Sequence, residues 1–385
     1  MSDSYIHRLS SRKIEESPKS VLLLGPRQTG KSTLIKILKP ELTINLADEG
    51  EFLLFTQNPD ELKQRLASTQ YKTVFIDEVQ RLPGLLNTVQ SILDDQDNMI
   101  KFYLTGSSAR KLKRGKANLL PGRVFNYQLG PLVTSELNYR IDTEKALSTG
   151  TMPGVYSENN PKFRYKTLRS YASTYLKEEI QAEALARNLE GFSRFLYFAA
   201  IYSGHFLDIS KLASEAQVPR QSAVRYFEIL EDTLIVNRSP SYLKANKKRL
   251  VKHPKYYFFD TGVLNGLLSN FNVSPDRAGL HFEHLIFNQI LSSAYAKDVD
   301  IQISTFRTPD GAEVDFIVEI EGVLFAIEVK HSKNIGPSDL KGLSNFTKSS
   351  LIKCNPMIFY TGNIERKIEN IFVLPWQKGM REIGL

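Results

Sequence analysis

The sequence predicts an α/β protein with several domains: a parallel sheet, a mostly helical middle and a second, mixed α/β region. Three observations lead to this class. Residues 20–130 alternate short apolar runs with amphipathic stretches, residues 162–268 keep helical spacing with few turn signals, and strand-like runs return after residue 300. A chain of 385 residues also exceeds what one hydrophobic core usually serves. The predicted domains span residues 1–135, 136–192, 193–268 and 269–385.

The first domain is predicted to contain a set of short, buried strands. They are Val21–Leu24, Thr43–Leu46, Val74–Asp77, Ile100–Thr105 and Val124–Leu129. Each is an apolar run bounded by turn residues or by amphipathic stretches. Because strands that alternate with helices form parallel sheets covered by those helices, we expect this architecture here.

The segment after the first strand predicts a phosphate-binding loop. Gly25, Gly30, Lys31 and Ser32 match the pattern GxxxxGK[ST] between a strand and a helix. The glycines let backbone N–H groups surround a phosphate, Lys31 reaches the β and γ phosphates, and Ser32 offers its hydroxyl to Mg²⁺. The predicted nucleotide contacts are Gly25, Pro26, Arg27, Gln28, Thr29, Gly30, Lys31, Ser32 and Thr33, together with Asp77.

Polar residues at the ends of the next strands complete the predicted site. Asp77 is expected to hold Mg²⁺, and Glu78 to orient and polarise the attacking water. The strand KFYLTGSS ends in small polar residues, of which Ser107 is preferred to Thr105 for a hydrogen bond to the water or the γ phosphate.

An arginine before the fifth strand is the candidate for action between subunits. Arg123 is placed to face a neighbouring subunit and to act on the charge of the transition state. The alternative is that Arg123, or Arg110, lies on a solvated face.

The middle of the chain predicts a winged helix. Residues 206–236 show a helix, a short turn, a second helix and a strand, and the second helix presents Arg220, Gln221 and Arg225 where a recognition helix contacts DNA. A basic run without an acidic residue follows it. Its members are Lys244, Lys247, Lys248, Arg249, Lys252 and Lys255. Phosphate contacts from such a hairpin would weaken with salt. The alternative is a helical module for protein contacts whose lysines are merely solvated.

The C-terminal region predicts a helix followed by strands. After the turn-rich stretch Ser269–Gly279, an amphipathic helix covers His281–Ala294. The predicted strands are Ile301–Phe306, Val314–Glu319 and Leu324–Lys330. A mixed α/β domain is therefore expected here.

Charged residues on these C-terminal strands predict a second site. Glu328 and Lys330 are two apart on one strand and share a face, and Asp315 lies on the strand before. Asp315 and Glu328 would hold Mg²⁺, while Lys330 would position or deprotonate a water. This arrangement resembles the restriction-endonuclease-like superfamily, in which a preceding helix supplies a further acid, here Glu283. The same fold can also serve as a DNA-binding platform without cleavage.

The ordered series of motifs resembles the AAA+ ATPases, and more closely a prokaryotic family that joins this ATPase to a C-terminal domain of unknown function 4143. The segments that carry the resemblance are GPRQTGKST, VFIDEVQRLPGLL, LTGSSA and LPGR, followed by TMPGVY, YYFFDTGVLNGLL, HFEHLIFNQI, EVDFIVE and FAIEVK. The resemblance covers nearly the whole chain. It implies a five-stranded parallel sheet, ATP and Mg²⁺ as ligands, and a ring in which Arg123 takes the position of an arginine finger.

Composition indicates which partners, compartment and kinds of metal site are expected. Lysine and arginine exceed aspartate and glutamate by 50 to 42, and the resulting charge of +8 favours polyanionic partners. The apolar runs are shorter than the roughly 18 residues of a membrane span, so a cytoplasmic protein without membrane contact is expected. The single cysteine, Cys354, excludes an internal disulfide and a cysteine-based zinc site. His281, His284 and His331 are expected in surface or capping roles.

The sequence thus predicts an ATP-driven machine that assembles as a homo-oligomeric ring, a hexamer, and binds DNA. ATP turnover would remodel the DNA by unwinding a fork or migrating a branch, as DNA repair requires. Two alternatives stay open. One is a Mg²⁺-dependent nuclease regulated by the ATPase domain, and the other is an ATP-gated switch that acts on a protein partner.

Overall fold

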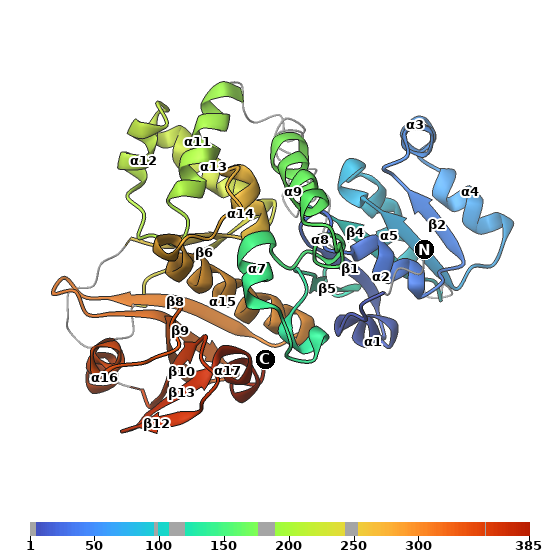
Figure 1. The fold of residues 1–385 in the computed structure, drawn as a ribbon. Helices are drawn as coiled ribbons and strands as arrows, with labels where there is room; N and C mark the ends of the chain where they lie inside the picture. The colour runs from blue at the N-terminus through green and yellow to red at the C-terminus, as the bar shows by residue number, and fades with distance from the viewer. Residues whose placement is uncertain (1–4, 96–98, 108–119, 176–188, 243–252, 351) are drawn as a thin grey trace. The chain divides into compact units, whose positions relative to one another are not determined.

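The computed structural model describes residues 5–95, 99–107, 120–175, 189–242, 253–350 and 352–385. The chain divides into two compact units, and Figure 1 colours it from blue at the N-terminus to red at the C-terminus. Unit 1 comprises Met1–Gly130 with Asp232–Ile235, and unit 2 comprises Pro131–Glu231 with Val236–Leu385. Within the described parts of the chain, every helix is too short or too polar to cross a lipid bilayer.

Unit 1 is built on a five-stranded parallel sheet with the order β2-β3-β4-β1-β5. Its strands are β1 (Ser20–Leu24), β2 (Leu42–Asn45), β3 (Thr73–Asp77), β4 (Lys101–Gly106) and β5 (Val124–Gln128). The five strands predicted from the apolar runs are therefore confirmed. Because all strands run the same way, the residues that follow β1, β3 and β4 meet at one edge of the sheet.

Helices cover both faces of this sheet. The described helical segments are α1 (Ser10–Glu15), α2 (Lys31–Ile37), α3 (Glu49–Gln57), α4 (Glu61–Ser68), η1 (Val79–Arg81) and α5 (Leu85–Asp94). Alternate residues of β1 point to opposite faces, so Val21 packs with the core of α1 and α2 while Leu22 packs with that of α5. The sheet is thus buried on both sides, which explains why its strands are continuous apolar runs.

The helical part of unit 2 follows the first sheet in the sequence. Its elements are η2 (Thr134–Leu137), α7 (Thr143–Thr149), α8 (Pro153–Tyr156), α9 (Pro161–Ser170), η3 (Tyr171–Tyr175), α11 (Leu189–Ile201), α12 (Ile209–Glu215), α13 (Arg220–Asp232) and α14 (Thr261–Leu267). Aromatic side chains join α11 to α13. Phe192 lies 5.0 Å from Tyr226 and Phe195 lies 4.9 Å from Phe227, measured between ring centroids.

The predicted order of helix, turn, helix and strand is present around α12 and α13. Asp208 caps α12 by accepting hydrogen bonds from Ser210 and Lys211, and β6 (Val236–Ser239) follows α13. The strand β6 pairs antiparallel with β7 (Lys255–Phe258). Of the basic run between these strands, Lys244, Lys247, Lys248, Arg249 and Lys252 lie outside the described residues.

The C-terminal part of unit 2 is a six-stranded mixed sheet with the order β12-β13-β11-β10-β9-β8. Its strands are β8 (Ile301–Arg307), β9 (Glu313–Ile320), β10 (Val323–Lys330), β11 (Cys354–Tyr360), β12 (Arg366–Ile368) and β13 (Ile371–Pro375). The pairs β8–β9 and β9–β10 are antiparallel, whereas β10–β11 and β11–β13 are parallel.

Helices cover this sheet on both faces. Its helical elements are α15 (Pro275–Lys297), η4 (Pro337–Leu340), α16 (Lys341–Ser349) and α17 (Trp376–Glu382). One core joins α15 and α17 to the sheet, and a second joins α16 to its other face. Figure 1 draws these elements as orange and red ribbons. The turn predicted up to Gly279 was wrong from Pro275 onward. Proline in the first turn and Asp276 beside it both favour a helix start, so α15 begins there.

The segment that opens unit 2 is bound to elements more than 100 residues away. The backbone N–H of Thr134 donates to Gln289 at 2.8 Å, and that of Thr151 donates to Asp260 at 2.7 Å. The N–H of Ile141 donates to Gln377 at 2.7 Å. These side chains satisfy backbone groups of an irregular segment, which fixes it to unit 2.

Candidate nucleotide site

The loop between β1 and α2 has the backbone that a phosphate loop requires. Gln28 and Gly30 take left-handed conformations, with φ of 64° and 94°. Gly25 has no room for a side chain, because an added Cβ would lie 2.2 Å from the carbonyl oxygen of Leu129. The loop is therefore tightly curved and packed against the chain that leaves β5. The other predicted contacts, Pro26, Arg27, Thr29 and Thr33, lie in this loop or just after it.

Lys31 is held by the loop itself. Its side chain is buried, with the residue 5% exposed, and its Nζ donates hydrogen bonds of 2.8 Å to the carbonyl oxygens of Gly25 and Pro26. Both of these acceptors are backbone oxygens of the loop, so the ammonium group lies against the loop itself.

Ser32 and Asp77 meet at the end of β3. The Ser32 hydroxyl donates to Asp77 Oδ1 at 2.9 Å, and the Thr105 hydroxyl donates to the same oxygen. A hydroxyl beside a carboxylate is the kind of oxygen pair that binds Mg²⁺ next to a phosphate. The residues present therefore fit the predicted ion.

Glu78 follows Asp77 in a left-handed conformation, with φ of 57°. Its carboxylate accepts a hydrogen bond from Gln80 Nε2, which also donates to the Ser107 hydroxyl at 3.0 Å. The two predicted catalytic side chains, Glu78 and Ser107, are thus joined by an amide that the sequence analysis did not assign. Gln80 stands two residues after Glu78 in VFIDEVQ, and its position beside the carboxylates was the available signal.

Arg8 is a second residue that the sequence analysis did not assign, and it hydrogen-bonds the phosphate loop. Its guanidinium donates to the carbonyl oxygen of Thr29 at 2.6 Å and to that of Gly130 at 2.9 Å. Arg8 is 3% exposed. It therefore connects the phosphate loop to Gly130, the end of the first segment of unit 1, a contact across 122 residues that no local pattern reveals.

Arg123 makes an ion pair within its own chain. Its Nε donates to Asp94 Oδ1, and both side chains are partly exposed, at 36% and 43%. The role of Arg123 between subunits stays a prediction. Arg110 lies outside the described residues.

The C-terminal sheet brings the second set of predicted residues together. Ile327 pairs with Phe316, so the next residues on β10 and β9, Glu328 and Asp315, are neighbours. The N–H of Val329 donates to Asp315 Oδ2 at 2.8 Å, and Lys330 Nζ lies 2.6 Å from Glu328 Oε1.

Burial changes the acidity of these two carboxyl groups. Burial, followed by the charges of Glu328 and Glu283, raises the pKa of Asp315 well above its usual range. Burial also raises the pKa of Glu328, although Lys330 opposes this.

Glu283 is engaged by residues from β7. Lys255 Nζ lies 2.9 Å from Glu283 Oε1, and the Tyr257 hydroxyl donates to the same oxygen at 2.5 Å. Lys255 was expected among the basic residues that contact DNA, and this was wrong: it is 3% exposed and paired with acids. A lysine inside the aromatic run KYYFF is a signal for such a buried pair. Over the ranges that the structure describes, three or more histidine, cysteine, aspartate or glutamate side chains are nowhere grouped so as to hold a metal ion.

Two of the three histidines are buried, which corrects the expected surface roles. His281 is 4% exposed and its Nε2 lies 2.8 Å from Asn265 Oδ1, while His284 is 1% exposed and its Nε2 lies 2.5 Å from the carbonyl oxygen of Phe258. Burial, with the nearby charge of Arg277, lowers the pKa of His281 to about 4. Burial lowers the pKa of His284 to about 3. Both histidines are therefore neutral parts of the core.

Comparison with known families divides the chain into three consecutive matches. The model of the AAA domain matches residues 17–138, and that of a domain of unknown function numbered 4143 matches residues 278–378. This chain joins an AAA domain to a domain of unknown function 4143. A further domain of unknown function, numbered 8612, matches residues 140–274 between them. The AAA domain contains the whole site from Gly25 to Ser107.

The names of the sequence relatives state no activity. Uncharacterized proteins of Mycobacterium bovis and Mycobacterium tuberculosis are each 26% identical to this chain over 325 residues, which covers 81% of this chain and 70% of each relative. A structure of Pif1 helicases at forked DNA has 12% identity and a TM-score of 0.25, and covers 46% of this chain and 56% of its own. NtrX from Brucella abortus with ATP has 14% identity and a TM-score of 0.25, and covers 57% and 66%. The chain thus spans about half to two thirds of the length of these structures.

The predicted DNA-reading residues outside the AAA domain lie on one helix. Arg220, Gln221 and Arg225 are exposed on α13, whereas Tyr226 and Phe227 are buried on its other side. Arg220 Nε also donates to the Ser210 hydroxyl at 3.2 Å. The helix therefore presents basic and amide groups to solvent.

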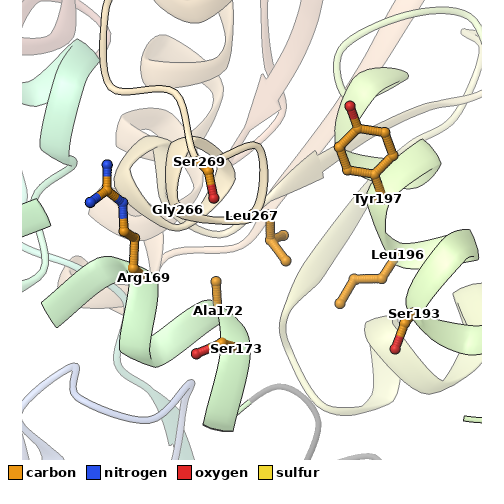
Figure 2. Close-up of a pocket in the computed structure, with 9 residues that line it drawn as sticks. All are labelled: Arg169, Ala172, Ser173, Ser193, Leu196, Tyr197, Gly266, Leu267 and Ser269. Atoms are coloured by element: carbon orange, nitrogen blue, oxygen red, sulfur yellow. The ribbon is translucent and has the colours of Figure 1, made fainter. Parts of the chain in front are cut away.

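A pocket of about 270 Å³ lies in unit 2 among α9, η3, α11 and α14. Figure 2 shows Arg169 and Ser269 on one side of it and Ser193 and Tyr197 of α11 on the other. Its volume is near the lower end of the roughly 300–1,000 Å³ typical of ligand pockets. It contains none of the predicted site residues.

Proposed function

We propose that this chain is an ATP-hydrolysing, ring-forming machine of the cytoplasm that binds DNA and remodels it. The observation that carries the proposal is the gathering of Lys31, Ser32, Asp77 and Glu78 at one edge of the parallel sheet of the AAA domain. These are the groups that a triphosphate, its metal ion and an attacking water require.

Each residue has a distinct task in this proposal. Lys31 exchanges its two carbonyl partners for oxygens of the β and γ phosphates. Ser32 and Asp77 would hold Mg²⁺, which when bound neutralises charge on the phosphates. Glu78 orients the attacking water. Gln80 hydrogen-bonds both the Glu78 carboxylate and the Ser107 hydroxyl and so fixes their relative position.

The DNA-binding part of the proposal rests on charge and exposure. The net charge of +8 attracts a polyanion, and α13 presents Arg220, Gln221 and Arg225 to solvent. We assign ATP hydrolysis to residues 1–135 and a helical connection to 136–192, and we assign DNA contact to the winged helix at 193–268 together with a restriction-endonuclease-like domain at 269–385. Lys244, Lys247, Lys248 and Arg249 would add phosphate contacts. Arg123 would act on the neighbouring subunit of a hexamer.

The test is ATP hydrolysis measured with duplex, single-stranded, forked and four-way DNA, with Glu78→Gln as the inactive control. We expect forked or four-way DNA to stimulate hydrolysis severalfold at low salt. Hydrolysis that ignores every DNA, together with no DNA binding at low salt, would exclude this function. Recovery of a specific protein partner in that case would favour the ATP-gated switch.

The convergence of Asp315, Glu328 and Lys330 on adjacent strands favours a second candidate, a Mg²⁺-dependent nuclease. Here Lys330 would position a water beside the two carboxylates. Incubation of DNA with Mg²⁺ should then give cleavage by the wild type and none by Lys330→Ala. Equal products from both proteins would mean that this site does not cleave DNA.

A further inference from the structure

Lys255, on β7, is a buried lysine that lies beside a group of acidic residues at the C-terminal sheet. We call this group, which comprises Glu283, Glu313, Asp315 and Glu328, the acidic centre. Its Nζ lies 2.9 Å from Glu283 Oε1 on α15 and 3.0 Å from Glu313 Oε1 on β9. Phe206 covers it, with the ring centroid 4.8 Å from Nζ. Three elements distant in the sequence therefore converge on one ammonium group.

The ammonium group is firmly charged. Burial opposes its charge, but the carboxylates of Glu283, Asp315 and Glu313 outweigh this and raise the pKa of Lys255. A lysine that is 3% exposed and paired with two carboxylates can neither move to solvent nor lose its proton without leaving buried negative charge behind.

The hydrogen bonds of Glu283 Oε1 occupy the positions at which a metal ion would bind this oxygen. A carboxylate oxygen has about two lone-pair sites. Those of Glu283 Oε1 are taken by Lys255 Nζ and by the Tyr257 hydroxyl, at 2.9 and 2.5 Å. A metal ion needs an oxygen at about 2.0–2.6 Å and would also face the positive charge of Lys255. Oε1 of Glu283 is thus committed to internal partners, and an ion at either oxygen of this carboxylate would lie beside the ammonium group of Lys255.

The other half of the acidic centre differs. Glu328 Oε1 accepts from Lys330 Nζ, while Glu328 Oε2 is buried and has no hydrogen-bond partner within the described part of the chain. Lys330 is 31% exposed in its side chain, compared with 4% for Lys255. The centre therefore consists of one half, at Asp315 and Glu328, with a buried carboxylate oxygen that lacks a hydrogen-bond partner in the described structure, and a second half in which Glu283 and Glu313 are paired with Lys255.

We infer that Lys255 is the permanent cation of the Glu283–Glu313 half, so that Glu283 is not a metal ligand in this protein. Removing the ammonium group converts this half into a binding site for a divalent cation. The inference is independent of the proposed ATPase function, and it removes Glu283 from the metal ligands predicted from the sequence.

The test counts Mn²⁺ bound to the full chain by electron paramagnetic resonance, without nucleotide and with Asp77→Asn in every variant to suppress the AAA site. We expect Glu283→Gln to leave Mn²⁺ affinity unchanged within about twofold. Lys255→Met should gain at least tenfold in affinity or one further ion per chain, and the added Glu283→Gln should abolish that gain. Lys330→Met is the matched control and should not create a site that depends on Glu283.

Two outcomes would overturn the inference. One is weaker Mn²⁺ binding in Glu283→Gln, which would make Glu283 a ligand of the resting protein. The other is no gain in Lys255→Met. If Lys255→Met folds poorly, its melting temperature is measured instead. Adding Glu283→Gln should then raise the melting temperature of Lys255→Met. If the added substitution fails to raise it, the pairing is not what stabilises this centre.

Discussion

The two charged centres of the molecule each contain a buried lysine, and the partners of these lysines differ. Lys31 donates to the neutral carbonyl oxygens of Gly25 and Pro26, whereas Lys255 pairs with the carboxylates of Glu283 and Glu313. Lys31 is thus anchored on the backbone of the predicted phosphate loop, whereas carboxylates neutralise Lys255. The comparison teaches that the groups around a buried lysine, as well as its burial, bear on whether it binds a ligand or stabilises the fold.

The largest effect should separate the centres by activity. Glu78→Gln removes the carboxylate that orients the water, so hydrolysis should fall by about 10²- to 10⁴-fold while ATP binding stays within about threefold. Lys330→Met, in the second centre, should leave hydrolysis unchanged. Single-turnover hydrolysis and equilibrium binding of a fluorescent ATP analogue measure the two quantities. Loss of hydrolysis in both variants would show that the centres are not independent.

The two lysines should respond in opposite ways. Lys31→Ala removes a charged donor to phosphate, which should weaken ATP binding by roughly 10- to 100-fold with little change in stability. Lys255→Met leaves carboxylates buried without their partner and should lower the free energy of unfolding by about 3–5 kcal/mol without changing ATP affinity. Titration of a fluorescent ATP analogue and urea unfolding compare them. The contrast fails if Lys31→Ala destabilises the protein as much as Lys255→Met.

Acid should weaken unit 2 through its buried histidines. The pKa values of His281 and His284 are lowered to about 4 and about 3, so their contribution to stability is complete above pH 6.5 and is lost as the pH falls. His281 alone accounts for up to about 3 kcal/mol, since one pKa unit corresponds to about 1.4 kcal/mol. Burial raises the pKa of Asp260 to about 6, so its contribution has the opposite sign between about pH 4 and 6. Asp315 and Glu328, whose pKa values burial also raises, contribute with the same sign as Asp260, so the effect of a histidine is measured as the difference between the wild type and its variant.

Urea unfolding at several pH values between 7 and 4 measures this. Trp376 is the single tryptophan of the chain and lies in unit 2, so its fluorescence reports unit 2 alone. As the pH falls from 7 to 4, the urea midpoint of the wild type should fall relative to that of His281→Asn. The same dependence on pH in both proteins would contradict the lowered pKa of His281.

The smallest effect concerns DNA. Arg225→Ala should remove one phosphate contact and reduce the slope of log affinity against log salt concentration by about one. Lys36→Ala, an exposed lysine of the AAA domain, serves as the control and should leave the slope unchanged. Fluorescence anisotropy with a labelled forked DNA over a salt series gives both slopes. Identical slopes in all three proteins would exclude Arg225 from the DNA contact.

Local patterns predicted much of this structure because its strands and motifs are local. Apolar runs predicted the five strands of the AAA domain, and the spacing of two placed Glu328 and Lys330 on one face of β10. They did not predict the partners of Lys255, because Glu283 and Glu313 lie 28 and 58 residues further along the chain. A basic residue in a basic run has the same appearance whether it is solvated or buried in an ion pair.

The histidines and Arg8 teach the same lesson. His284 was expected in a surface or capping role, and the packing of α15 against β7 buries it with its Nε2 beside the carbonyl oxygen of Phe258. Arg8 precedes the recognisable motif and reaches Gly130 across the fold. Long-range pairing, rather than propensity, decides the role of such residues.

The attachment of residues 134–143 to the final helix has a consequence for biosynthesis. Thr134 donates to Gln377, Trp376 donates to Thr143, and Tyr139 donates to the carbonyl oxygen of Leu385, across 233 to 246 residues. At about 5–20 residues translated per second, a ribosome needs roughly 10–50 s to make the missing partners. The parallel sheet can form early in that interval. During the same time residues 134–143 have been synthesised, but their C-terminal hydrogen-bond partners have not. A message cut short before codon 376 would therefore yield a chain whose first sheet is complete and whose second unit cannot close.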